Sequence, residues 1–354
     1  MNVSARALVL LAAAAFITGC ATRPPIGAGA PSDTRPQPQQ VLRSLALDRT
    51  AEDRILALDP RHVSAADVRM TLAAAPAPRV VLLHGGIFPV HLLMVSFGRF
   101  LTGMGYPEAS IRNPGDRRWS HSPYEYSDQL AGLVAWHYEH DGMRPMLIGH
   151  SQGGIQAVKV LYDLAGQYGA AIPVWNPVAD NAEDRTTIVD PLTGSERPVV
   201  GLSVSYASAV GAGGAALLLP NQWSMAGHSR RIPDTVDEFT GFAIGLDLIA
   251  WTFAGEDSTR RYRRTGAAEV RNVLLPASYS HVFVPLTHPL ARDQVARDWI
   301  DAYVAAAGEE PPAPPDGLPA NVLWAADVWY SVKKHWVLEA QRLIRARRAA
   351  LGPR

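Results

Sequence analysis

The sequence MLIGHSQGGIQAVKVLYDLA, residues 146–165, places an apolar run, a glycine-flanked serine and a helix-forming segment in direct succession. The run 146–148 is short and wholly apolar, as expected for a strand covered on both faces. Residues 152–165 lack proline and glycine beyond their first turn. The two segments therefore predict a buried strand followed by a helix, with Ser151 at the turn between them.

Gly149, Ser151 and Gly153 form the pattern Gly-x-Ser-x-Gly. Between a strand and a helix, this pattern predicts a nucleophile elbow, a strained turn that lifts the serine hydroxyl out of the sheet. Side chains at positions 149 and 153 would clash with neighbouring backbone in such a turn. The helix that begins at Gln152 points its first N–H groups at the site, where they stabilise negative charge. We therefore expect Ser151 to be a catalytic nucleophile.

Apolar runs alternate with helix-forming segments along much of the chain, which predicts an α/β fold with a mostly parallel sheet and helices on both faces. The expected strands are 80–83, a short one around Ile111, 146–148, 199–207, 246–253 and 270–275. The expected helices are 50–59, 64–75, 91–103, 123–140, 152–165, 294–307 and 320–350. The stretch 170–245 fits this alternation poorly, and we interpret it as a loop-rich, cap-like insertion around one strand.

A second motif, His84-Gly85-Gly86, follows the predicted strand 80–83. With both motifs, the chain resembles the α/β-hydrolase superfamily, in particular lipases and esterases with HG-type oxyanion loops and GHSQGG elbows, over roughly residues 77–305. The resemblance implies an oxyanion hole made by the backbone N–H groups of Gly86, with Ile87 as second choice, and of Gln152. His84 is expected to brace the loop. The resemblance also implies the triad order serine, acid, histidine.

Two histidines follow the last predicted strand, His281 in a short loop and His288 seven residues later. The family places its histidine in the loop directly after that strand, so the resemblance favours His281. In that role, His281 would take the proton of Ser151 and later give it to the leaving group.

The acid must accept the proton-bearing nitrogen of His281, so it is expected in a loop at the same sheet edge. The family pattern of strand, Gly, Glu and Asp favours Asp257 in Ala254-Gly-Glu-Asp257, with Glu256 as the alternative. Asp247 falls inside the predicted strand 246–253, where its side chain would not point out at the strand end.

Residues 1–19 combine Arg6, the apolar run 7–16 and a small-residue end, which predicts a secretory signal peptide. Ile17-Thr-Gly-Cys20 resembles the lipobox of bacterial lipoproteins, which implies diacylation of Cys20, the single cysteine of the chain. Ala21, in place of an aspartate, favours the outer membrane within that resemblance. Residues 20–40 are rich in Pro, Gly, Ser and Gln and predict a disordered tether.

The expected hydrolase domain is 41–308, followed by a proline-rich linker, 309–319, and a C-terminal helix, 320–350. Beyond Lys333 this helix is strongly basic, a pattern that suits either the surface of an anionic membrane or, more often, packing on the domain. The apolar candidates for its buried face are Val322, Val332, Trp336, Ala340 and Leu343.

The 354 residues carry 33 basic and 33 acidic side chains, so no overall positive field suggests a nucleic-acid partner. The Gly-rich stretch 211–216 resembles a dinucleotide motif, but Pro220 arrives too soon for the helix that such a site needs. His137, His140 and Asp141 lack further ligands for a metal. We expect no cofactor and no metal; the oligomeric state is open.

These features together predict a serine hydrolase of carboxylic esters, with lipid-like or other apolar acyl esters favoured by the expected anchor and cap. An acyltransferase with the same triad is the first alternative, since an alcohol or amine can replace water. A non-catalytic envelope protein on the same fold is the second. A fluorophosphonate probe, which labels only an activated serine, separates the enzyme from the binding protein.

Overall fold

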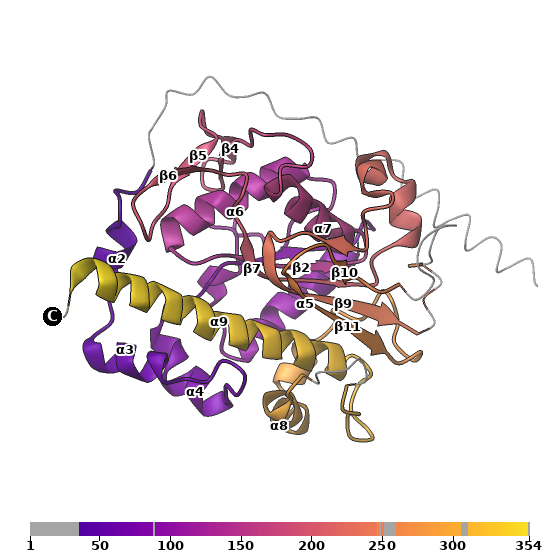
Figure 1. Cartoon of the computed structure of the whole chain (residues 1–354). Coiled ribbons are helices and arrows are strands. Elements are labelled where there is room, and N and C mark those ends of the chain that lie inside the picture. Colours follow the sequence, from indigo (N-terminus) through magenta and orange to yellow (C-terminus); the bar gives the residue numbers. More distant parts are fainter. Residues whose placement is uncertain are drawn as a thin grey trace, which may run out of the picture.

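The computed structural model describes residues 35–87, 89–245, 247, 249–250, 260–305 and 311–352. At its centre lies a five-stranded sheet in the order β1-β2-β7-β9-β11, with every neighbouring pair parallel (Figure 1). The strands are β1 (Val80–Leu83), β2 (Met146–His150), β7 (Val204–Val210), β9 (Val236–Ile244) and β11 (Glu269–Leu275). Because all five run the same way, the segments that follow their carboxyl ends meet at one edge of the sheet.

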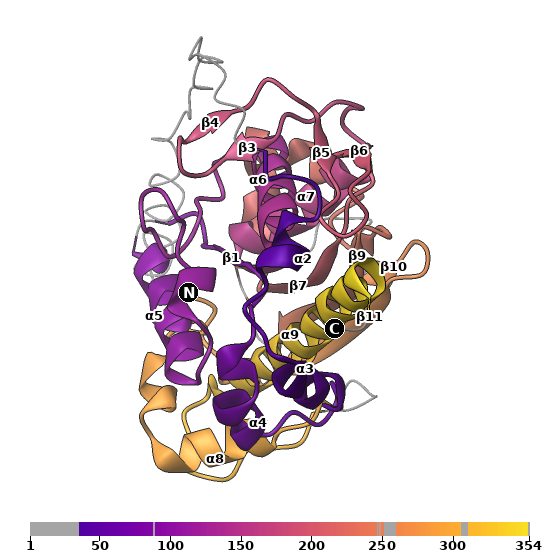
Figure 2. The ribbon, with the colours of Figure 1, turned by 90° about the vertical axis from the view of Figure 1, so that its left-hand side faces the viewer.

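Helices cover both faces of this sheet, which confirms the predicted α/β fold (Figure 2). One face packs against α6 (Ser127–Asp141) and α7 (Gln152–Leu164), and the other against α5 (Val90–Gly103), α8 (Gln294–Ala302) and α9 (Val322–Leu351). Successive residues of β1 face opposite sides of the sheet. Leu82 lies in the core beneath α5 and α9, and Val81 lies in the core beneath α6 and α7. The wholly apolar strand signal reflects this double burial.

Within the part of the chain that the structure describes, three short helices precede the sheet, and the first two pack against α9. They are α2 (Gln40–Ser44), α3 (Arg49–Leu56) and α4 (Ala65–Met70). Helix α4 begins with the predicted capping box, in which Ser64 and Asp67 each accept a hydrogen bond from the other's backbone N–H. The 3₁₀ turns are η1 (Leu72–Ala74), η2 (Glu108–Ser110), η3 (Gly214–Leu218), η4 (Pro220–Met225) and η5 (His288–Ala291).

The stretch 170–245 differs from the prediction of loops around one strand, because it supplies two central strands, β7 and β9. Its remaining parts are short and irregular. They comprise the pairs β3 (Trp175–Asn176) with β4 (Asn181–Ala182), and β5 (Thr187–Val189) with β6 (Glu196–Pro198), the turns η3 and η4, and β8 (Arg231–Ile232), which pairs with β10 (Arg263–Arg264).

Two other predicted strands were wrong. Ile111 follows a 3₁₀ turn, and at the free edge of β1 the described residues form a single bridge, between Leu83 and His121. The predicted strand 246–253 is replaced by β9, which ends at Ile244; the described residues 247, 249 and 250 lie in an irregular segment.

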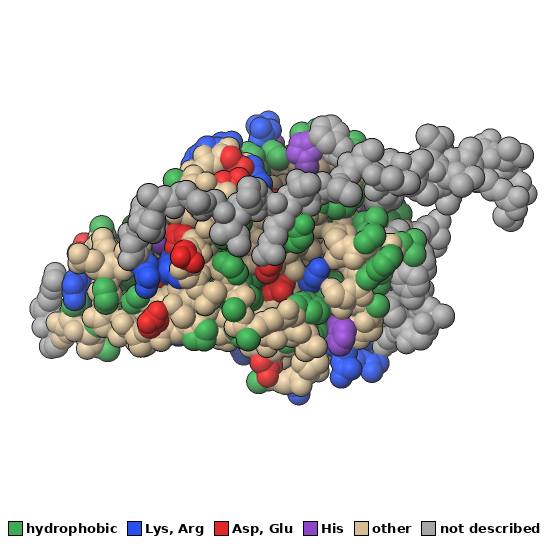
Figure 3. Space-filling model, turned by 90° about the horizontal axis from the view of Figure 1, so that it is seen from above, with side chains coloured by type: hydrophobic (Ala, Val, Ile, Leu, Met, Phe, Trp, Pro, Cys, Tyr) green, Lys and Arg blue, Asp and Glu red, His purple; other side chains and the backbone are tan. Residues whose placement is uncertain are grey.

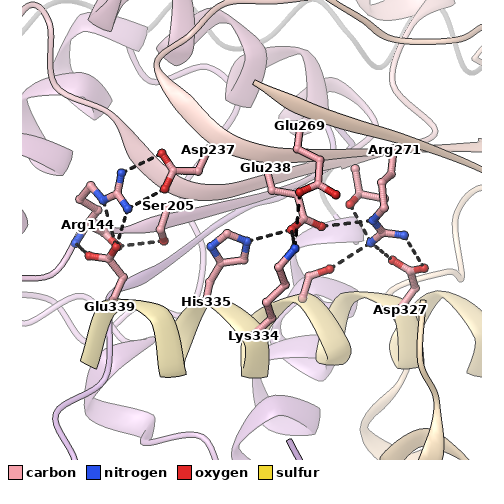
Figure 4. A network of polar contacts seen from close by, with 12 residues as sticks. Arg144, Ser205, Asp237, Glu238, Glu269, Arg271, Asp327, Lys334, His335 and Glu339 are labelled. Atoms are coloured by element: carbon pink, nitrogen blue, oxygen red, sulfur yellow. Dashed lines mark hydrogen bonds and ion pairs between the residues drawn. The ribbon is translucent and has the colours of Figure 1, made fainter. Parts of the chain in front are cut away.

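Helix α9 packs lengthwise on the sheet, and its five predicted apolar residues are all buried there. Polar contacts also join helix and sheet (Figure 4). Arg271 of β11 bonds both carboxylate oxygens of Asp327 at 2.7 and 3.1 Å and bonds Glu238 of β9 at 3.2 Å. Glu238 also accepts hydrogen bonds from Lys334 and His335 of α9. None of the described helices is long and apolar enough to cross a bilayer.

Arg271→Leu is expected to lower the free energy of unfolding by about 3–5 kcal/mol, because it leaves the buried carboxylate of Asp327 without the guanidinium that bonds both its oxygens and takes one cationic partner from Glu238. The side chains of Asp327 and Glu238 are only 1% and 2% exposed. Urea unfolding measures the loss.

Arg49→Leu is the matched control for that measurement. Arg49 makes an ion pair with Asp53 in which both side chains are more than half exposed, so its loss is expected to cost less than about 1 kcal/mol. Equal losses in the two variants would show that the buried network does not stabilise the fold.

Candidate active site

Ser151 occupies the turn between β2 and α7 in the strained geometry expected of an elbow. Its φ and ψ are 55° and −124°, a region that non-glycine residues rarely adopt. A Cβ at position 149 would lie 2.3 Å from the carbonyl oxygen of Gly153, and a Cβ at position 153 would lie 2.3 Å from that of Leu83. Glycine at both positions is therefore a steric requirement of the turn.

Ser151 meets His281, which lies in the loop after β11. The serine Oγ is 2.9 Å from His281 Nε2, and His281 Nδ1 is 2.7 Å from Asp247 Oδ2. A carboxylate only accepts hydrogen bonds, so Nδ1 carries the proton and Nε2 is left to accept the serine hydroxyl. This tautomer is the one in which histidine can act as a base toward serine. The alternative histidine, His288, instead begins η5 and bonds Ser96 through its backbone N–H.

The carboxylate partner of His281 is Asp247, which the sequence analysis set aside. Asp247 lies beyond the end of β9 rather than inside a strand, and its other oxygen accepts the N–H groups of Ile249 and Ala250 at 2.9 Å. Burial alone would raise the pKa of Asp247, but the hydrogen bond and charge of His281 outweigh it, so the pKa is lowered. Asp257 and Glu256, the predicted acid and its alternative, lie outside the described residues.

Gly211, directly after β7, makes room for this arrangement. It has a φ of 60°, and a Cβ there would lie 2.9 Å from the imidazole ring of His281 and 3.4 Å from Asp247 Oδ2. In the sequence, this glycine stood out only as part of the stretch 211–216 that resembles a dinucleotide motif. Its place directly after β7, the strand next to the elbow strand β2, was the signal that could have identified Gly211.

His150, the residue before the nucleophile, also contacts the histidine loop. Its Nε2–H donates to the backbone carbonyl of His281 at 2.7 Å. Burial and the neighbouring His281 lower the pKa of His150 to about 3, so it is neutral at physiological pH. His150 therefore holds the position of His281 without adding a charge beside it. Sequence reasoning missed this residue because it stands at a variable position of the motif.

The predicted oxyanion donors lie beside Ser151. Gln152 begins α7, where the first N–H groups of a helix have no acceptor within it. The loop after β1 is held from two sides, since Tyr124 donates its hydroxyl to the Gly86 carbonyl at 3.0 Å and His84 Nδ1 lies 2.8 Å from the Gly85 carbonyl. Burial lowers the pKa of His84, which suits the bracing role expected for it.

A narrow cavity of about 40 Å³ opens onto these groups. Gly86, Ser151, Gln152 and His281 line it, with the apolar residues Val90, Ala216, Ile249 and Val282 among the rest of its wall. The described residues contain no cluster of side chains suited to hold a metal ion. Cys20, the predicted lipidation site, lies outside the described residues.

Comparisons with known proteins do not identify the function of this site. No family model and no curated protein matches the chain. Among solved structures, the chain is similar to one described as "RedJ with PEG molecule bound in the active site", with 17% sequence identity and a TM-score of 0.29. That match covers 63% of this chain and 91% of the other. A likeness at this level carries no conclusion about family or activity.

Proposed function

We propose that this protein is a serine hydrolase of carboxylic esters that uses Ser151, His281 and Asp247 as its triad and belongs to the α/β-hydrolase superfamily. The observation that carries the proposal is the unbroken chain of hydrogen bonds from Asp247 through His281 to Ser151 at a strained elbow. Strain of this kind costs about 1–3 kcal/mol and is found where it serves a site.

In the proposed reaction, Ser151 Oγ attacks the ester carbonyl carbon while His281 Nε2 takes the hydroxyl proton. The backbone N–H groups of Gly86 and Gln152 stabilise the oxyanion that forms. Breakage of the ester C–O bond leaves the acyl group on Ser151, and His281 gives its proton to the departing alcohol. Water then repeats the sequence, which releases the carboxylic acid and restores Ser151.

Apolar esters are the favoured substrates within this proposal. The cavity of about 40 Å³ is far smaller than the roughly 300–1,000 Å³ of a pocket that encloses a whole ligand, so most of a substrate would lie over its rim. Ile249 lines the cavity and is partly exposed, and Leu218 and Phe283, which follow lining residues closely in sequence, are exposed. Strands β9 and β11 point toward the right-hand end of the molecule in Figure 1. Figure 3 shows hydrophobic side chains at that same end.

The test is labelling of the purified protein with a fluorophosphonate, together with hydrolysis of p-nitrophenyl esters of graded acyl chain length. We expect one labelled serine and measurable ester hydrolysis. Absence of labelling in folded protein would favour a non-catalytic binding role instead.

We also propose that residues 1–19 direct export and that a diacylated Cys20 anchors the protein, through the segment 20–40, to the outer membrane. Cys20→Ser is expected to move the protein from the membrane fraction to the soluble fraction without loss of activity, because Cys20 precedes the proposed domain in the sequence and is not part of the proposed triad. Fractionation and metabolic labelling with a palmitate analogue measure the change.

Ser32→Ala, a substitution in the same segment, is the control and should leave both the labelling and the fractionation unchanged. Membrane attachment that survives Cys20→Ser would show that another part of the chain holds the protein there.

A further inference from the structure

The cavity at Ser151 is walled by segments from two sides of the elbow strand. Strands β1 and β7 flank β2 on opposite sides, and β9 and β11 lie beyond β7. The segment after β1 contributes Gly85, Gly86, Ile87 and Val90 to the cavity wall. The segments after β7, β9 and β11 contribute Gly213, Ala216, Ile249, His281 and Val282, which we call the histidine side.

The alcohol portion of an ester must lie on the histidine side. The departing alcohol takes its proton from His281 Nε2, so its oxygen has to come within hydrogen-bond reach of that atom. The carbonyl oxygen of the same ester lies toward the proposed oxyanion donors, the backbone N–H groups of Gly86 and Gln152. The side chains beside His281 are therefore the ones that an alcohol portion would contact.

Ile249 is held beside His281 by the carboxylate of Asp247. Its backbone N–H donates to Asp247 Oδ1 at 2.9 Å, and Asp247 Oδ2 lies 2.7 Å from His281 Nδ1. The side chain of Ile249 lines the cavity and is 39% exposed. A cavity of about 40 Å³ holds only the atoms next to the ester carbonyl, so the rest of an alcohol would lie along the exposed part of this wall.

The histidine side is apolar around the proton donor. Apart from His281, the described residues that line the cavity on this side have no polar side chain. Methylene groups gain free energy when they leave water for such a surface. A further hydroxyl on the alcohol would lose its water there without a hydrogen-bond partner.

We propose that Ile249, with Val282, forms the binding site for the alcohol portion of the ester and selects alkyl alcohols over polyols. This inference rests on the proposed ester hydrolysis. It also implies that an alkyl alcohol can replace water in the second half of the reaction. His281 Nε2 would take the proton of that alcohol, its oxygen would bond to the acyl carbon, and the bond from that carbon to Ser151 Oγ would break. The proton would then return to Ser151 Oγ.

The test measures how one acyl-enzyme divides between acceptors of equal chain length. Wild type is given p-nitrophenyl butyrate in water with either 1-butanol or 1,2,4-butanetriol, and the new butyrate ester and the free butyric acid are quantified by chromatography. We expect the ratio of ester to acid to be at least about 10-fold higher for 1-butanol at equal acceptor concentration.

Ile249→Ala is expected to lower the ratio for 1-butanol by about 5- to 10-fold and to change the ratio for the triol little, because it removes apolar wall. Ile249→Val should keep most of the preference. Val90→Ala is the matched control, since Val90 lines the cavity on the side of β1, and it should leave both ratios unchanged. Because each ratio compares two fates of one acyl-enzyme, a general loss of activity cancels.

Three results would overturn the inference. Equal use of the two alcohols by wild type, or butyric acid without any butyl ester, would show that no alkyl alcohol site exists. Equal falls in both ratios in Ile249→Ala would show that the residue does not select between alcohols. An equal effect of Val90→Ala would place the alcohol elsewhere. In each case fluorophosphonate labelling of Ser151 persists, whereas absence of labelling contradicts the proposed function.

Discussion

Ser151→Ala is expected to abolish ester hydrolysis, with a loss in kcat on the order of 10⁶-fold, and to prevent fluorophosphonate labelling. The substitution removes the oxygen that lies 2.9 Å from His281 Nε2 and leaves the elbow backbone unchanged. Alanine and serine meet the same strain at a φ of 55°, so the fold is expected to persist. The measurements are p-nitrophenyl ester hydrolysis, probe labelling and thermal unfolding.

Ser205→Ala is the control for that experiment. Ser205 is a buried serine of β7 that donates its hydroxyl to the Arg144 carbonyl, at the end of the sheet opposite the elbow. We expect this variant to lose some stability and to keep both labelling and hydrolysis. Labelling that persists in Ser151→Ala would mean that another residue is the nucleophile.

Asp247→Asn is expected to lower kcat by about 10⁴-fold while KM and Tm change little. The amide would keep the shape of the carboxylate but lose the charge that stabilises the imidazolium form of His281. Its NH₂ group, turned toward Nδ1, would also favour the tautomer that cannot accept the Ser151 proton. Steady-state kinetics on a p-nitrophenyl ester, with thermal unfolding as a check on folding, measure both effects.

Asp257→Asn tests whether Asp257 or Asp247 is the acid of the triad. The sequence pattern favoured Asp257 as the acid, whereas the carboxylate hydrogen bonded to His281 is Asp247. We expect Asp257→Asn to retain most of its activity. A large loss in Asp257→Asn together with a small one in Asp247→Asn would return the role to the segment 251–259.

The sequence predicted most reliably those features that local rules produce. The elbow could be predicted because Gly149 and Gly153 meet backbone atoms only a few residues away or on the adjacent strand β1. His281 could be predicted only through the family resemblance, which places the histidine in the loop after the last strand. The buried strands β1 and β2 could be predicted because 80–83 and 146–148 are wholly apolar, as is typical of parallel strands covered on both faces.

Strand β9 escaped prediction because two of its polar residues are buried. Glu238 and Thr240 are buried, where Glu238 meets Lys334 and His335 of α9 and Thr240 meets Arg271 of β11. Read alone, such residues indicate a solvent-exposed loop. Without β9 at 236–244, the next apolar run was taken for the strand, and Asp247 was placed inside it.

The sequence by itself therefore determined the α/β class and the elbow, because these depend on apolar periodicity and on short-range sterics, whereas the choice of His281 came from the family resemblance. Only the tertiary structure decided that Asp247 is the carboxylate at His281 and that Gly211 and His150 fit around it. It also decided that the basic helix α9 belongs to the core. No local pattern pairs the residues that make these contacts, and a buried charge looks like an exposed one until its partner is known.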